Sequence, residues 1–126
     1  MIENNNMNVK NVRLLLMDGN ELNRCYLLHQ MGALNISCDS VANLHEAEKI
    51  SKSNSYHIII AHLNAFESKK YYQIKEYRSQ FPDILFLVTG LQNQVDRYED
   101  LVPFGVNHFV SQTNVVKFVE ELLASA

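Results

Sequence analysis

The sequence predicts an α/β domain in which a parallel sheet is covered by helices on both faces. Short apolar runs alternate strictly with segments that repeat apolar residues at helical spacing, and five such pairs follow one another. The apolar runs are largely continuous, which is typical of parallel strands buried on both faces. The chain has 126 residues, a length that suits a single hydrophobic core. We therefore expect one domain over residues 11–126, preceded by a flexible segment over residues 1–10.

The first half of the chain contains two of these pairs. Residues 12–17 form a short apolar run, and apolar side chains recur at intervals of three and four over residues 21–34, which predicts a helix. Asn35 is a plausible end for that helix, because asparagine tolerates the left-handed backbone found there. Residues 36–41 alternate apolar and polar side chains like a half-buried strand, and residues 44–50 repeat apolar side chains like a short helix.

The second half supplies the other three pairs. Strands are expected over residues 57–62, 84–88 and 106–110, each an apolar run with turn or polar residues after it. The helices between and after them are marked by Tyr71, Ile74 and Tyr77, by residues 93–101 before Pro103, and by Val115, Val119 and Leu122. We expect Tyr71 and Tyr77 to be core residues on one helix face.

Polar residues stand where several of these strands end. Asp18 follows the first strand, His62 ends the third, Thr89 ends the fourth and Gln112 follows the fifth. The carboxyl ends of parallel strands are where α/β proteins bind ligands, so we expect these side chains to meet at one edge. A histidine is a poor ligand for magnesium, which strongly prefers oxygen. The set therefore favours binding over catalysis.

Composition excludes several classes of function. The net charge is −3 and the 11 basic residues do not cluster, so no nucleic-acid partner is expected. No signal peptide is visible and no apolar run is long enough to cross a bilayer, which favours a cytoplasmic protein without a membrane partner. Cys25 and Cys38 lack metal-binding spacing, and we expect both to be small buried apolar side chains.

Several motifs together resemble the receiver domain of two-component response regulators. They are the stretch from Leu14 to Arg24, the triplet Ser55-Tyr56-His57, the pair Thr89-Gly90, and the stretch from Gly105 to Phe109. The resemblance covers nearly the whole chain, from Asn11 to Leu123. It implies a flavodoxin-like (βα)5 sandwich of three layers with strand order 2-1-3-4-5.

The positions that carry phosphoryl transfer in that family are mostly altered here. The resemblance assigns an acid pair to Asp18 and Gly19, the phosphoacceptor aspartate to His62, a hydroxyl to Thr89 and a lysine to Gln112. Transfer to a carboxylate needs a nucleophile, a bound metal and a cationic side chain. Here the nucleophile and the cation are missing, and one of the two metal-binding acids is replaced. The sequence therefore resembles a pseudo-receiver that is not an enzyme and has no metal or other cofactor. We expect His62 to fill the disused pocket and to hydrogen-bond Asp18 or Thr89.

The resemblance also implies protein partners: a kinase, a regulator or an output protein, and self-association as a further option. In the family, such contacts use the face of the fourth helix, fifth strand and fifth helix. Here that face should contain Tyr98 and Phe109, with Lys117 and Glu121 near its rim. Without a phosphoryl group to drive a switch, Thr89 and Phe109 should keep one arrangement, and partner binding should be constitutive.

Other interpretations stay open. His62 could itself be phosphorylated in a working receiver, or the chain could be the regulatory domain of a larger kinase or transcription factor. A small-molecule binder of flavodoxin-like fold is less favoured, because Asp18-Gly19-Asn20 is not a glycine-rich phosphate loop. A transition-metal site on Asp18 and His62 is also disfavoured, because structural zinc sites almost always need four ligands.

Overall fold

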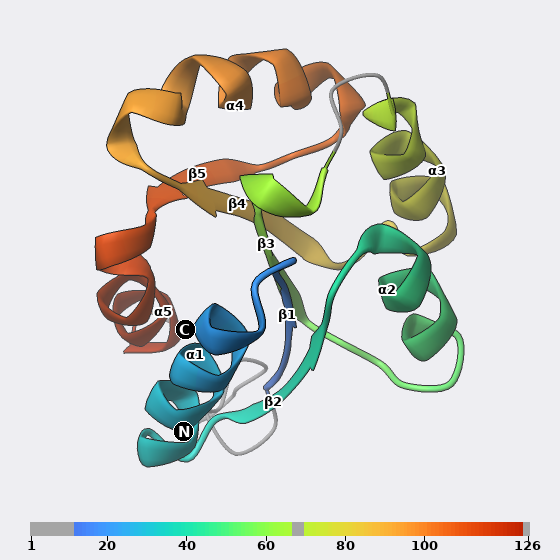
Figure 1. The fold of residues 1–126 in the computed structure, drawn as a ribbon. Coiled ribbons are helices and arrows are strands. Elements are labelled where there is room, and N and C mark those ends of the chain that lie inside the picture. The colour runs from blue at the N-terminus through green and yellow to red at the C-terminus, as the bar shows by residue number, and fades with distance from the viewer. Residues whose placement is uncertain (1–11, 67–69, 125–126) are drawn as a thin grey trace.

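The computed structural model describes residues 12–66 and 70–124. Within them the chain forms a five-stranded parallel sheet in the order β2-β1-β3-β4-β5 (Figure 1). Its strands are β1 (Arg13–Met17), β2 (Ser37–Val41), β3 (Ile58–His62), β4 (Leu85–Gly90) and β5 (His108–Ser111). The expected flavodoxin-like fold and strand order are confirmed. The expected flexible segment, residues 1–10, lies outside the described residues.

Helices cover both faces of the sheet and make three layers (Figure 1). One face is covered by α1 (Glu21–Ala33) and α5 (Val115–Ala124), and the other by α2 (Leu44–Ser51), α3 (Tyr72–Gln80) and α4 (Val95–Leu101). Short 3₁₀ helices η2 (Leu63–Ala65), η4 (Gln92–Gln94), η5 (Val102–Phe104) and η6 (Gln112–Asn114) connect them. No helix of the described residues is long and apolar enough to cross a membrane.

Alternation along the strands divides the core in two. In β1, Leu14 and Leu16 pack toward α1 and α5, whereas Leu15 and Met17 pack toward α2 and α3. The same alternation places the even-numbered Ile58 and Ile60 of β3 on the α1–α5 side, because successive strand residues point to opposite faces. Polar residues in the same phase at the strand ends therefore point toward that side.

The ends of α1 follow local side-chain chemistry. Asn20 caps the helix, since its side-chain oxygen accepts the Asn23 N–H at 3.0 Å. The chain leaves the helix through Asn35, whose φ of 60° lies in the left-handed region that asparagine tolerates. Asn35 was expected to end the helix, and this is confirmed.

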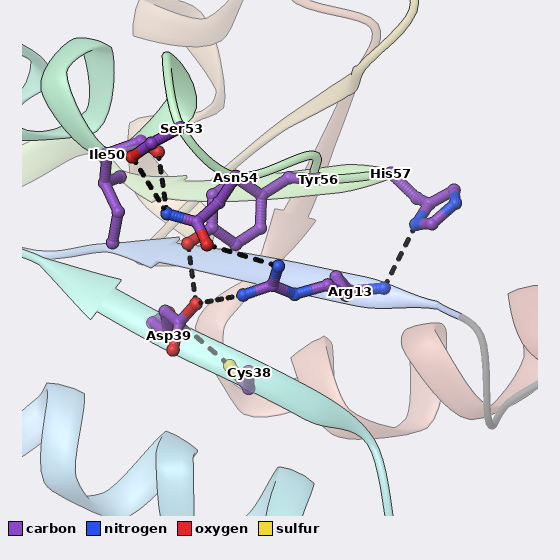
Figure 2. Close-up of polar contacts among 8 residues, drawn as sticks. All are labelled: Arg13, Cys38, Asp39, Ile50, Ser53, Asn54, Tyr56 and His57. Atoms are coloured by element: carbon purple, nitrogen blue, oxygen red, sulfur yellow. Dashed lines mark hydrogen bonds and ion pairs between the residues drawn. The ribbon is translucent and has the colours of Figure 1, made fainter.

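A polar cluster joins edge strand β2, the start of β1 and the segment before β3 (Figure 2). Asp39 Oδ2 on β2 accepts hydrogen bonds from Arg13 Nη2 on β1 at 2.9 Å and from the Tyr56 hydroxyl at 2.6 Å. The Arg13 guanidinium also lies 5.0 Å from the centre of the Tyr56 ring, and its Nη1 donates to Asn54 Oδ1 at 3.4 Å. Burial, together with the hydrogen bond to Asp39, raises the pKa of the Tyr56 hydroxyl above its usual value.

Two expectations about local structure need correction. The last strand begins at His108 rather than at residue 106, although Asn107 still exchanges hydrogen bonds with the Phe86 backbone. Cys25 is exposed. It lies six residues before Met31, the buried residue of α1, and at 3.6 residues per turn this spacing places the two on different faces of the helix. Cys38 is partly buried as expected, and burial raises its thiol pKa to about 12.

Candidate functional site

The structure brings Asp18, His62 and Thr89 together at the carboxyl edge of the sheet. His62 and Thr89 are paired neighbours on β3 and β4, and Asp18 directly follows β1. All three line one cavity on the α1–α5 side, as the alternation of the strands requires. The structure thus places these residues at one edge of the sheet.

Asp18 is buried, with only 2% of its surface exposed. One carboxylate oxygen, Oδ1, accepts the Asn20 N–H at 2.8 Å and the Asn64 side-chain N–H at 2.9 Å. The other oxygen, Oδ2, is buried and has no hydrogen-bond partner within residues 12–66 and 70–124. Arg24 lies nearby, but its guanidinium donates to the main-chain carbonyl of Asp18, at 2.7 Å. The hydrogen bonds that hold the carboxylate in place are therefore all made through Oδ1.

His62 is held at both ring nitrogens. Nδ1 accepts the backbone N–H of Asn64 at 3.1 Å, so the ring proton belongs on Nε2, which then donates to Gln112 Oε1 at 2.9 Å. This is the neutral tautomer, and it also caps η2. The prediction that His62 bonds Asp18 or Thr89 is wrong. The ring is hydrogen-bonded instead to the backbone of Asn64 on η2 and to Gln112 on η6.

Asn64 is a site residue that the sequence analysis missed. Its side chain joins three parts of the site: Nδ2 donates to Asp18 Oδ1, Oδ1 accepts the Gly19 N–H at 3.0 Å, and its backbone bonds His62. A small amide two residues past a strand-ending polar residue was the available signal. The result is a chain of contacts from Asp18 through Asn64 and His62 to Gln112.

Gly19 and Gln112, which stand where the family has an aspartate and a lysine, both take part in these contacts. Gly19 is exposed, and a Cβ added there would meet Asn64 at ordinary van der Waals distances. Gln112 is an exposed neutral amide that accepts from His62. Among the described residues lining the cavity, Asp18 is the single carboxylate. The described part of the chain has no group of three or more His, Cys, Asp or Glu side chains able to hold a metal ion.

Thr89 is the next-to-last residue of β4, and its buried hydroxyl has no hydrogen-bond partner among the described residues. It lies in the cavity with Asp18 and His62, which has a volume of about 430 Å³. The rest of the lining comes from α1, η6 and the start of α5: Asn23, Tyr26, Leu27, Gln30, Gln112, Thr113, Val115 and Val116.

A second hollow, of about 640 Å³, lies on α4, β5 and α5. It contains the four residues expected on this face: Tyr98, Phe109, Lys117 and Glu121. The rings of Tyr98 and Phe109 lie 5.9 Å apart, and the Tyr98 hydroxyl donates to the Asn107 carbonyl at 3.3 Å. We call this hollow the α4–β5–α5 groove.

Comparison with known proteins finds proteins of similar structure but no match by sequence. No family model matches the chain, and no curated protein matches it. The Vibrio cholerae chemotaxis protein CheY4 superposes with a TM-score of 0.74 at 15% identity, over 87% of this chain and 97% of CheY4. A two-component response regulator from Clostridium difficile gives 0.76 at 16% identity, over 90% and 96%.

A third protein of similar fold is seen in a complex. The complex contains the Saccharomyces cerevisiae histidine phosphotransfer signalling protein and the receiver domain of its downstream response regulator. The match has a TM-score of 0.66 and 18% identity, over 79% of this chain and 77% of the other. The chain thus has the receiver-domain fold of two-component signalling proteins.

Proposed function

We propose that this chain is a pseudo-receiver, a non-enzymatic domain that binds protein partners without being phosphorylated. The observation that carries the proposal is the network at the strand ends. The side chain that ends β3 is His62, which is held by hydrogen bonds to Asn64 and Gln112. Asp18 is the only carboxylate among the described residues of the cavity, and the position of the expected cation is neutral Gln112.

Phosphoryl transfer at this site would lack its main electrostatic supports. The developing charge of the transition state needs a metal or cationic side chains preorganised around it. Asp18 with Gly19 supplies one carboxylate for a hard cation that usually wants several oxygens. His62 Nδ1 already accepts a backbone hydrogen bond, so that ring nitrogen is not available to attack a phosphoryl group.

The experiment is incubation with acetyl phosphate and Mg²⁺, followed by intact-protein mass spectrometry. We expect the mass to stay unchanged, while a phosphorylatable receiver domain treated in parallel gains a phosphoryl group. The variant His62→Asp alone should also stay unmodified, because Gly19 supplies no second carboxylate for a metal and Gln112 supplies no positive charge. A stoichiometric adduct on the unmodified sequence that disappears in His62→Ala would instead support phosphorylation of His62.

The α4–β5–α5 groove is the surface that we assign to partner binding. It combines aromatic side chains at Tyr98 and Phe109 with a charge of each sign at Lys117 and Glu121. Central aromatic residues with charges around them resemble the anchors and rim of protein–protein interfaces. The partners that fit this proposal are a kinase, a regulator, an output protein or a second copy of the chain.

A further inference from the structure

Helix α1 carries a stripe of side chains that faces away from the sheet. Its members recur at intervals of three and four residues and so share one helix face: Leu22, Cys25, Tyr26 and His29. All four are exposed, and Leu22 and Tyr26, at 79% and 62%, are the two most exposed large hydrophobic side chains of the described residues. Met31, the buried residue of α1, lies about two and a half turns beyond Leu22 and marks the opposite face. The outward stripe therefore plays no part in the core.

Two members of this stripe, Cys25 and His29, are metal-ligand side chains one helical turn apart. Residues four positions apart on a helix have Cβ atoms about 5–6 Å apart, and the same spacing lets the two histidines of an H-E-x-x-H helix bind one zinc ion. Both side chains are exposed, and neither makes a hydrogen bond, ion pair or ring contact with another described residue. Thiolate and imidazole are the ligands that Zn²⁺ prefers. Helix α1 therefore presents two adjacent zinc ligands to solvent.

Two ligands leave such a site half complete. Structural zinc sites almost always have four protein ligands, and within residues 12–66 and 70–124 no third His, Cys, Asp or Glu side chain joins this pair. A second copy of the chain can supply the missing two, because a two-fold axis brings the same surface of both copies together. With the two α1 helices antiparallel and the axis at the level of Leu27, Cys25 of each copy faces His29 of the other.

The rest of the stripe fits this antiparallel pairing. The same axis places Leu22 of each copy opposite Gly32 of the other, and a Cβ added at Gly32 would meet no atom within 4 Å, so the space for the leucine side chain is open. Glu21 and Arg24 are the only acidic and basic residues of α1, and the axis brings neither against a like charge. Antiparallel helices also place the positive end of one helix dipole beside the negative end of the other.

We propose that α1 is a zinc-dependent homodimer interface, in which Cys25 and His29 of two copies hold one Zn²⁺ in a Cys₂His₂ site. Each thiol releases its proton to solvent when it coordinates, and each imidazole binds in its neutral form. Stable interfaces bury about 800 Å² on each partner, and four side chains of one helix supply much less, so the copies should associate here only when the metal is bound. The site is independent of the proposed pseudo-receiver function and of the α4–β5–α5 groove, because it uses none of the residues on which those rest.

The test is sedimentation velocity of the full chain in a phosphine reductant, which prevents disulfides, first with a chelator and then with added Zn²⁺. We expect a monomer with the chelator, and with Zn²⁺ a dimer that binds one ion per two chains. Co²⁺ in place of Zn²⁺ should give the thiolate charge-transfer absorption and the visible bands of a tetrahedral site. A chain that stays monomeric with Zn²⁺, one ion bound per chain, or a dimer that is present with the chelator and unchanged by Zn²⁺ would each overturn the proposal.

Matched variants then test the two ligands. Loss of a residue that only supports a metal ligand weakens binding about 10–100-fold, so Cys25→Ser and His29→Ala should each weaken Zn²⁺ at least about tenfold and prevent the dimer. Cys38→Ser and His45→Ala are the controls and should dimerise like the unmodified chain. Cys38 is partly buried with its thiol donating to the Asp39 carbonyl, and His45 is exposed on α2. A Cys25→Ser chain that is folded by circular dichroism and still dimerises fully with Zn²⁺ would contradict the proposal.

One further variant tests the antiparallel arrangement. Gly32→Phe fills the space assigned to Leu22 of the other copy, while a Cβ at this position meets no atom of its own chain within 4 Å. The variant should therefore stay folded and lose the zinc-dependent dimer. Gln73→Phe adds the same side chain at an exposed position of α3 and should keep the dimer. Undiminished zinc-dependent dimerisation of Gly32→Phe would overturn the antiparallel α1 interface.

Discussion

Thr89 places a hydroxyl at the end of β4 where the described structure offers it no partner. Burying an unpaired hydroxyl lowers stability by roughly 1–3 kcal/mol, and valine has nearly the same shape without that group. We expect Thr89→Val to raise the free energy of unfolding by about 1 kcal/mol. Urea denaturation followed by circular dichroism measures the change.

Thr113→Val provides the control for this prediction. Thr113 is exposed, and its hydroxyl lies 3.3 Å from that of Ser111, so its loss should leave the unfolding free energy nearly unchanged. A Thr89→Val protein less stable than the unmodified one would mean that the Thr89 hydroxyl has a partner in solution.

The site residues show what sequence alone could supply. Asp18, His62 and Thr89 were predictable because each ends an apolar run, and parallel strands end at one edge. The partners of His62 were not, because they depend on how the β3–η2 turn and η6 approach the ring. Asn64 was missed for the same reason: an asparagine in a turn has many local uses, and only the folded chain brings it to Asp18.

At the scale of elements, periodicity identified each strand and each α-helix of the described residues. It did not show in every case which face of the helix is buried. The continuous runs of β1, β3 and β4 gave the buried strands, and the helical spacing gave the core positions Tyr71 and Tyr77. Helix α1 was harder, because it carries apolar side chains on its exposed face as well. Leu22 and Tyr26 are 79% and 62% exposed, so the pattern alone did not show that Cys25 also lies outside the core.

The polar cluster that joins β1 and β2 makes stability depend on alkaline pH (Figure 2). Tyr56 has a pKa raised above its usual 10.0, chiefly by burial and then by its hydrogen bond to Asp39. A group with a raised folded pKa stabilises the protein below its usual pKa, and this contribution is lost as the pH rises above that value. The unfolded chain releases the Tyr56 proton first, which favours unfolding above about pH 10.

Tyr56→Phe tests this coupling. At about pH 8 the variant should be less stable by about 1 kcal/mol, because the bond to Asp39 is lost. At about pH 11 the difference should shrink, because the variant has no phenol to ionise. Urea titrations at the two pH values measure both terms. Tyr72→Phe, at an exposed position of α3, should show no difference at either pH; a Tyr56 effect independent of pH would contradict the coupling.

At the scale of the whole molecule, the two hollows lie on different faces. The cavity beside Asp18 opens between α1 and the start of α5, whereas the α4–β5–α5 groove follows the edge strand of the sheet. Edge strand β5 pairs with β4 alone, so the described sheet ends there. The two hollows share no lining residue, although α5 contributes to both.

The aromatic centre of the groove should dominate partner binding. Tyr98 and Phe109 pack against each other and line the groove, and an aromatic anchor is typically worth about 2 kcal/mol or more on truncation. Rim charges contribute much less. We expect Tyr98→Ala or Phe109→Ala to weaken the partner complex or self-association far more than Lys117→Ala or Glu121→Ala.

Quantitative pull-down from native cells with each variant measures partner binding, and sedimentation velocity of the purified proteins measures self-association. Circular dichroism shows whether each variant is folded, which matters most for the partly buried Phe109. The double variant Tyr98→Ala, Phe109→Ala should lose the captured partner while Lys117→Ala retains it. If the folded double variant captures the same proteins as the unmodified chain, the interface lies elsewhere. The exposed apolar side chains of α1, Leu22 and Tyr26, are then the next surface to change.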